Sequence, residues 1–229
     1  MQQTIVRLAH LDQAHRSVVR ALRAVCATAL LLVAAVAVAA PAGATGDASS
    51  GAFTFMQGLG NDAIKELTDR AIPRPEREAR FRRLLNNHFD MAAISKFVLG
   101  RYYRSISDQQ RADFQRLFVD FMVGSYSVSF SEYMGKGLTV TGAAAADGDT
   151  ILVHSKIDMP SSADAHVDWR LRLAEGRFAI VDIIVEGVSM EVTQRSQFAS
   201  MIQDRGGVDG LIAALRSRNP QSADSSVPQ

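Results

Sequence analysis

Hydrophobic residues follow two different spacings in two successive parts of the chain. In the first part they recur every three or four residues, which is typical of amphipathic helices. The clearest helix begins at a capping box, SDQQ at residues 107–110, and continues through an aromatic stripe over 114–133. Helices are also predicted over 76–88 and, between a capping aspartate and a terminating glycine, over 90–100.

The second part alternates between apolar and polar residues, which is typical of half-buried strands. Strands are predicted over residues 138–146, 150–159, 165–174 and 177–185. In the third of these, Val167, Trp169, Leu171 and Leu173 share one face, and the other face is charged. The fourth is apolar on both faces, which predicts a central strand covered on both sides.

Helical spacing returns over residues 191–203 and 208–216. Helices, then an antiparallel meander, then helices again indicate an α+β fold. We therefore expect helices packed on a twisted antiparallel sheet of about four strands, which could enclose an apolar, cone-shaped cavity.

The first 44 residues have the composition of an export signal. Four arginines accompany a single acidic residue, an uncharged run covers 24–40, and small residues follow, with Ala42 and Ala44 in an A-x-A pattern. This order is typical of a secretory signal peptide cleaved after Ala44. A retained membrane anchor is the alternative, but a run of about 17 residues is at the short limit for spanning a bilayer.

The sequence thus predicts a signal peptide over 1–44, a flexible linker over 45–55, one domain over 56–217 and a disordered tail over 218–229. Cleavage removes the only cysteine, Cys26, and leaves 21 basic and 23 acidic residues, a net charge of −2. Disulfides, thiolate catalysis and cysteine-held metals are then excluded, and no nucleic-acid partner is implied. We expect a periplasmic protein.

Candidate catalytic residues are few. The histidines of the mature chain, His88, His154 and His166, fall on separate predicted elements without metal-ligand spacing. Asp182 interrupts the apolar run over 180–184. It could be a buried base with a raised pKa in an isomerase or dehydratase, or a structural carboxylate that accepts hydrogen bonds or pairs with an arginine. The aromatic stripe is similarly either plain core or the lining of a pocket.

Three segments together resemble the MlaC/toluene-tolerance family of periplasmic phospholipid-binding proteins. They are FDMAAISKFVLGRYYR at 89–104, DQQRADFQRLF at 108–118, and VDIIVEGVSM at 181–190 with RSQF at 195–198. The last is the most specific, and the order and spacing of the three also fit. The resemblance covers the whole predicted domain.

This resemblance implies a soluble, non-catalytic lipid carrier without a cofactor. Such a carrier would exchange a phospholipid with an outer-membrane lipoprotein complex and with the substrate-receiving subunit of an inner-membrane ABC transporter complex. Arg101 and Arg104 would lie at the cavity rim or dock a partner, and we expect a monomer. The predicted lipid-contacting residues are Phe97, Phe118, Phe121, Met122, Tyr126, Val140, Ile151, Val153, Trp169, Leu171, Ile183 and Val185.

Three alternatives remain open from the sequence. One is a small-molecule enzyme that uses Asp182, and another is a docking module with a filled core. The third is a family member linked to hopanoid transport.

Overall fold

The computed structural model describes residues 42–69, 71–133, 137–158 and 164–218. Its sheet has five antiparallel strands in the order β1-β2-β3-β4-β5, each beside its neighbour in the sequence. The strands are β1 (Leu138–Ala145), β2 (Thr150–Ile157), β3 (Ala165–Ala174), β4 (Arg177–Val185) and β5 (Val188–Ser189). The predicted α+β class is confirmed, and the first four strands lie where the alternation predicted them. The two-residue strand β5 was not predicted.

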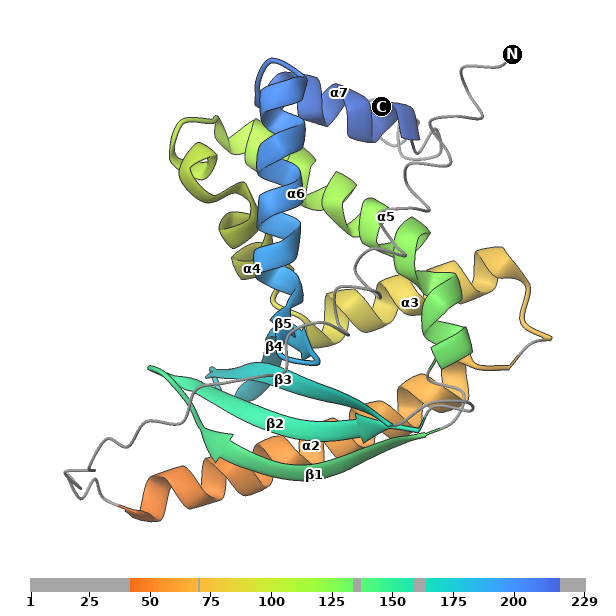
Figure 1. The fold of residues 1–229 in the computed structure, drawn as a ribbon, viewed down its shortest axis with the longest axis vertical. Helices are drawn as coiled ribbons and strands as arrows, with labels where there is room; N and C mark the ends of the chain where they lie inside the picture. The colour runs from red at the N-terminus through yellow and green to blue at the C-terminus, as the bar shows by residue number, and fades with distance from the viewer. Residues whose placement is uncertain (1–41, 70, 134–136, 159–163, 219–229) are drawn as a thin grey trace, which may run out of the picture. The chain divides into compact units, whose positions relative to one another are not determined.

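Six α-helices and one 3₁₀ helix complete the described part of the chain (Figure 1). They are α2 (Ala42–Leu67), α3 (Arg74–His88), α4 (Met91–Leu99), η1 (Gly100–Arg104), α5 (Asp108–Tyr133), α6 (Met190–Asp204) and α7 (Val208–Arg218). Within the described ranges, no helix is long and apolar enough to cross a membrane.

The predicted helix caps are confirmed. The Ser107 amide donates to the Gln110 side chain at 2.9 Å, and the Gln110 amide donates back to Ser107 Oγ at 3.2 Å. Asp90 caps α4 by accepting from the Ala93 amide at 2.8 Å. Gly100 follows α4 with φ +54°, in the left-handed region that favours glycine.

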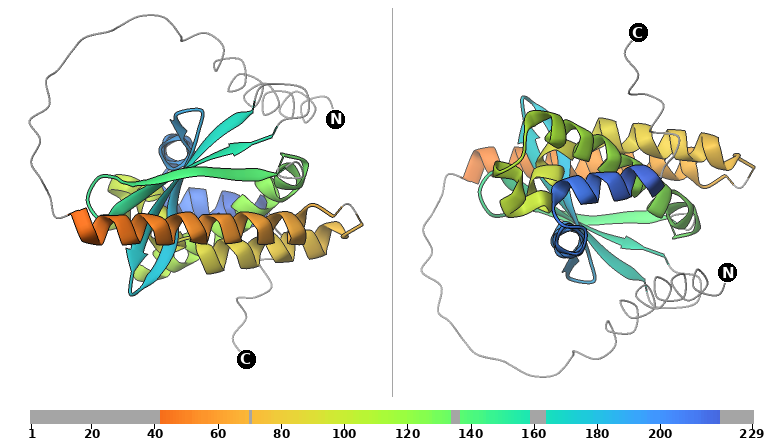
Figure 2. Two further views of the ribbon diagram at one scale, coloured as in Figure 1. Left: turned by 90° about the horizontal axis from the view of Figure 1, so that it is seen from below. Right: turned by 90° about the horizontal axis from the view of Figure 1, so that it is seen from above.

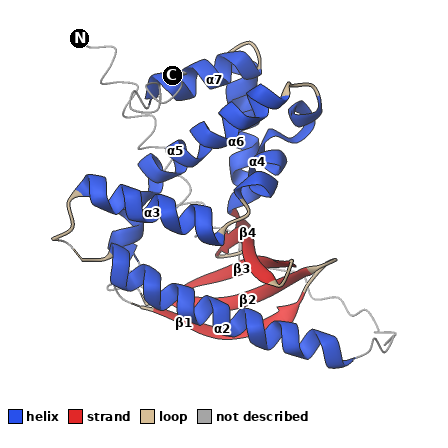
Figure 3. Cartoon of the chain, turned by 180° about the vertical axis from the view of Figure 1, so that it is seen from behind, coloured by secondary structure: helices blue, strands red, loops and turns tan. Residues whose placement is uncertain are grey.

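The structure differs from the sequence prediction at residues 45–55. These residues were expected to form a flexible linker, but they lie inside α2, which crosses one face of the sheet (Figure 3). Ala52 and Met56 are buried there. A methyl group added at Gly51 would meet the Phe178 ring at 3.1 Å. The small residues that resemble a linker therefore allow close approach of helix and sheet. Most of the predicted signal peptide and tail, residues 1–41 and 219–229, lie outside the described residues.

One buried cluster, which we call the sheet core, lies between α2 and the sheet. Val167, Trp169 and Leu171 of β3 are buried in it, as the alternation predicted. The Trp169 indole donates to Ser155 Oγ at 2.9 Å, so its polar atom is satisfied inside the core. Leu173 differs from the prediction: it is 41% exposed, because β3 ends there in the turn to β4.

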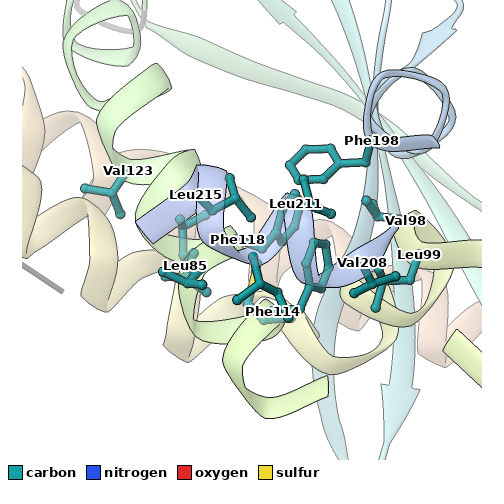
Figure 4. Packing of buried hydrophobic residues seen from close by; sticks show 14 of the residues in the cluster. Leu85, Val98, Leu99, Phe114, Phe118, Val123, Phe198, Val208, Leu211 and Leu215 are labelled. Carbon is teal, nitrogen blue, oxygen red and sulfur yellow. The ribbon is translucent and has the colours of Figure 1, made fainter. Parts of the chain in front are cut away.

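A second buried cluster, the helical core, is formed by α3 to α7 together with Leu67 at the end of α2 (Figure 4). Phe114 and Phe118 stack with ring centroids 5.6 Å apart, and both meet the edge of the Phe198 ring. These side chains are fully buried. The first half of the aromatic stripe is therefore packed core that joins α5 to α6.

β4 is buried on both faces at its middle, but it is not a central strand. It pairs along its length with β3, whereas only Ile184 and Val185 pair with β5. At its other end, the sheet is extended by a single parallel bridge between Phe89 and Ile180. Helices α4 and α6 contact β4, and Figure 2 shows α6, in blue, viewed along its axis beside the strands.

Candidate functional site

The predicted lipid-contacting residues separate into the two cores. From the sheet, Val140, Ile151, Val153, Trp169 and Leu171 are buried in the sheet core, and half-buried Ile183 and Val185 pack against it. From α5, Phe118 is buried in the helical core, and half-buried Phe121, Met122 and Tyr126 pack against it. Phe97 is half-buried beneath the Arg195 guanidinium, 5.0 Å from its ring centroid. Leu84 and Phe89 pack against both cores and connect them.

Burial divides these residues by what they can contact. Phe118, Val153 and Leu171 have no exposed surface, so protein atoms surround them completely. Six of the twelve predicted residues are only half-buried. The Arg195 guanidinium lies over the Phe97 ring, and we call the other five the half-buried set: Phe121, Met122, Tyr126, Ile183 and Val185.

Two exposed valines near the start of α6 were not predicted as site residues. Val188 is 42% exposed and Val192 is 52% exposed. Isolated apolar side chains are common on protein surfaces. These two stand four positions apart, at the junction of β5 and α6. In the segment EGVSMEV at 186–192, Val192 directly follows Glu191, and Val188 lies two positions after Glu186.

Asp182 holds the start of α6. Its carboxylate accepts from Ser189 Oγ at 2.7 Å and from the Glu191 amide at 2.9 Å. Ser189 Oγ accepts in turn from the Val192 amide at 3.1 Å. A carboxylate at a helix N-terminus is stabilised by the helix dipole and by free amide groups. The structural interpretation of Asp182 is confirmed: it accepts hydrogen bonds from the adjacent loop and helix.

The perturbed carboxyl group at this junction is Glu191. Burial, reinforced by the negative charge of Asp182, raises the pKa of Glu191 to about 7, and Arg170, Arg172 and Arg195 oppose this shift. The sequence analysis missed Glu191, because its environment is assembled by β3 and β4 rather than by its own neighbours in the chain.

A buried polar contact joins α5 to α6 near this carboxylate. Gln194 is 3% exposed, and its Nε2 donates to the Tyr126 hydroxyl at 2.9 Å. Burial raises the pKa of Tyr126, while its hydrogen bond with Gln194 acts in the opposite direction. The second polar atom of Gln194, Oε1, has no hydrogen-bond partner among the described residues.

Arg101 and Arg104 lie on η1, on the side of the helical part away from the sheet (Figure 1). The Arg101 guanidinium donates to the Tyr102 hydroxyl at 2.9 Å and lies 4.9 Å from the centroid of that ring. This hydrogen bond raises the pKa of Arg101 and lowers that of Tyr102. Both arginines are exposed, so a contact with another molecule is sterically open to them.

The fold and this site define a class: a small α+β domain with two apolar cores, partly accessible apolar side chains and a polar cluster at one helix start. The family model described as MlaC protein matches residues 58–217. The chain therefore belongs to the MlaC family, and the resemblance seen in the sequence is confirmed.

One curated protein and one solved structure are similar to this chain. The toluene tolerance protein ttg2D of Pseudomonas putida is 29% identical over 150 residues, which cover 63% of this chain and 69% of the relative. A phospholipid-binding protein from Ralstonia solanacearum, solved in complex with a phospholipid, superposes with a TM-score of 0.62 at 21% identity. That comparison covers 75% of this chain and 98% of the solved one, and it shows the same fold.

Proposed function

We propose that this protein binds a phospholipid and carries it through the periplasm without catalysing a reaction. The observation that carries the proposal is the half-buried set, which places accessible apolar side chains against both cores. Family membership supports it, as does the likeness to a protein solved with a phospholipid.

The hydrophobic effect gives the reason for such a carrier. Each acyl CH₂ removed from water contributes about 0.8 kcal/mol, so a long chain contributes on the order of 10 kcal/mol. A lipid leaves a membrane only when comparable apolar surface receives its chains. The half-buried set would contact those chains, and the fully buried residues, such as Phe118 and Leu171, would form the scaffold behind them.

An enzyme that uses Asp182 is a weaker candidate. Both carboxylate oxygens of Asp182 accept hydrogen bonds from the start of α6, and the side chain is only 5% exposed. A general base must lie within hydrogen-bond reach of the substrate proton, which burial of Asp182 prevents in this structure. The Asp182 carboxylate instead stabilises the start of α6 through these two hydrogen bonds.

Partners and cellular route belong to the same proposal. Export by residues 1–44 would place the domain between two membranes, where it would meet an outer-membrane lipoprotein complex and an inner-membrane ABC transporter complex. Exposed arginines such as Arg101 and Arg104 are candidates for docking these partners. We expect a monomer, because a carrier must present its bound lipid to each partner in turn.

Lipid uptake tests the proposal directly. Protein recovered from a Gram-negative periplasm is stripped of lipid, incubated with phospholipid vesicles and measured by native mass spectrometry. We expect a protein species with bound phospholipid. Absence of any lipid, both as purified and after incubation, would overturn the carrier proposal and favour a docking module. A polycyclic lipid in place of a phospholipid would assign the protein to a hopanoid-linked pathway.

A matched pair of variants tests the position of the lipid. Met122→Glu places a charge within the half-buried set, whereas Ser125→Glu places the same charge on an exposed position of the same helix. We expect Met122→Glu to lose most of the bound lipid and Ser125→Glu to keep it, with both variants folded by circular dichroism. Equal lipid content in the two folded variants would contradict the assignment of α5 as a lipid contact.

A further inference from the structure

Four exposed cations on α4, η1 and α6 form no ion pair among the described residues. We call them the cationic surface: Lys96, Arg101, Arg104 and Arg195. The contribution from α6 adjoins the one from η1, because a methyl group added at Gly100 would meet Arg195 Nε at 3.0 Å. Arg101 directly follows Gly100 in the chain. Side chains from separate helices therefore gather on one part of the molecule.

Acidic residues are absent from the segment that supplies most of this surface. The sequence has no aspartate or glutamate from residue 91 through residue 107. The two carboxylates that flank this segment are already bonded, since Asp90 caps α4 and Asp108 pairs with Arg111. Residues 45–229 together carry 21 basic and 23 acidic residues. The cationic surface is thus opposite in sign to the net charge of the domain that carries it.

Aromatic rings hold three of the four cations in place. The distances to the ring centroids are 4.9 Å for the Arg101 guanidinium over Tyr102, 5.0 Å for Arg195 over Phe97, and 5.6 Å for Lys96 Nζ over Tyr103. A cation over a ring face is attracted to the π electrons, and the ring restricts its rotamers. Less side-chain entropy is then lost when another molecule binds to these groups.

The chemistry of these side chains favours a protein partner over a bilayer. A guanidinium group donates two parallel hydrogen bonds to a carboxylate, and arginine and tyrosine are enriched at protein–protein interfaces. A surface that inserts into a bilayer needs several exposed apolar side chains. Among the described residues, Val192 is the only large exposed hydrophobic residue on these three helices. A single valine provides too little apolar surface for insertion.

We propose that the cationic surface docks an acidic surface of a partner protein, with the guanidinium groups of Arg101, Arg104 and Arg195 pairing with its carboxylates. This inference rests on the proposed function, because a carrier needs a partner that receives or supplies its lipid. It adds the chemistry of that partner and the face of the carrier that meets it. The lipid-contacting residues lie elsewhere, in the half-buried set, so docking and lipid binding can be measured separately.

Binding of an acidic peptide tests the inference. A fluorescently labelled oligoglutamate peptide is titrated with the protein at low salt, and fluorescence anisotropy gives the affinity. We expect binding that weakens as NaCl rises from about 20 to 150 mM, since salt screens exposed charges. Arg101→Glu combined with Arg104→Glu should weaken binding by about tenfold, because two attractions become repulsions. Lipid uptake by this variant should equal that of the wild type.

Two matched variants separate this surface from charge in general. Lys65→Glu combined with Arg177→Glu changes two other exposed cations without ion pairs, on α2 and β4, and lowers the net charge by the same amount. This control should bind the peptide within about twofold of the wild type. Arg101→Lys combined with Arg104→Lys keeps both charges but removes the planar guanidinium groups, so it should bind the peptide more weakly than the wild type.

The outcomes separate the inference from the proposed function. Lipid uptake by a wild type that does not bind the peptide would overturn the docking inference and leave the carrier proposal intact. An equal loss of peptide binding in the Lys65 and Arg177 control would also overturn it, as would a lysine variant that binds like the wild type. Sedimentation with phosphatidylglycerol vesicles that is lost in the Arg101 and Arg104 variant, without peptide binding, would replace the protein partner by an anionic bilayer. Peptide binding without any lipid uptake would overturn the carrier proposal alone.

Discussion

Removal of the Asp182 carboxylate should loosen the start of α6 and destabilise the whole domain. The side chain is buried and accepts two hydrogen bonds, from Ser189 Oγ and from the Glu191 amide. Hydrogen bonds to charged groups contribute about 1.5–3 kcal/mol each, and the two are coupled because they share one carboxylate. Asp182→Ala also leaves the two donors without an acceptor.

We therefore expect Asp182→Ala to lower the free energy of unfolding by about 2–4 kcal/mol. For a domain of this size, each 1 kcal/mol corresponds to a change in Tm of roughly 2–4 °C, so the loss should be roughly 4–16 °C. Asp182→Asn keeps one acceptor oxygen but loses the charge at the helix N-terminus, and it should be affected about half as much.

Urea denaturation followed by circular dichroism measures these changes. The control is Asp168→Ala, which removes a carboxylate paired with His154 at 2.8 Å on a partly exposed face of the same sheet. Exposed pairs contribute about 0–1 kcal/mol, so this variant should remain close to the wild type. An Asp182→Ala variant as stable as Asp168→Ala would refute the conclusion that Asp182 fixes α6.

Three further predictions follow from particular residues. Because the pKa of Glu191 is raised in the folded state, the unfolded state loses this proton first, and the free energy of unfolding should fall as pH rises from about 4.5 towards 7. Urea denaturation at a series of pH values measures this slope, and Glu191→Gln should make it flatter. Gly210→Ala should destabilise the protein by about 1–3 kcal/mol, because the added Cβ would meet the Arg205 carbonyl oxygen at 2.0 Å. Gly124→Ala places its Cβ in open space and should stabilise the protein by about 0.5–1 kcal/mol. Variants with the Tm of the wild type would contradict both predictions. Deletion of residues 45–55 should give insoluble protein by uncovering the sheet core, and a soluble, folded product would disprove that role.

Local signals in the sequence account for the elements that were predicted correctly. The capping box at Ser107 needs only residues within four positions, and its two hydrogen bonds form as expected. The alternation along β3 likewise depends on neighbouring positions only. Trp169 and Leu171 are buried while Arg170 between them is not, because one sheet face packs against α2.

The N-terminal half of helix α2 could not be predicted from the same kind of signal. Its N-terminal half is rich in small and polar residues, which is typical of a linker. Burial of Ala52 and the close approach of Gly51 to Phe178 depend on a sheet that forms almost 90 residues later in the chain. Contacts of this kind are set by tertiary packing, which overrides local composition.

The sequence predicted which faces of the elements are apolar, but it did not predict how exposed each residue is or which polar groups lie nearby. Sequence periodicity identified the correct faces of α5 and the sheet, but it could not separate buried Phe118 from half-buried Met122. Glu191 gave no signal, because its pKa is set by Asp182 and by arginines on another strand. Periodicity reports which side of an element is apolar, whereas exposure and charge depend on what packs against it.

Helix α6 joins β4 to α5 and to the helical core. Asp182 anchors this helix to β4, Gln194 binds Tyr126 of α5, and Phe198, one turn further, enters the helical core. A lipid carrier must hold its cargo through water and still release it to a partner. Burial of a long acyl chain contributes on the order of 10 kcal/mol, so the proposed carrier can retain its lipid through the acyl chains alone.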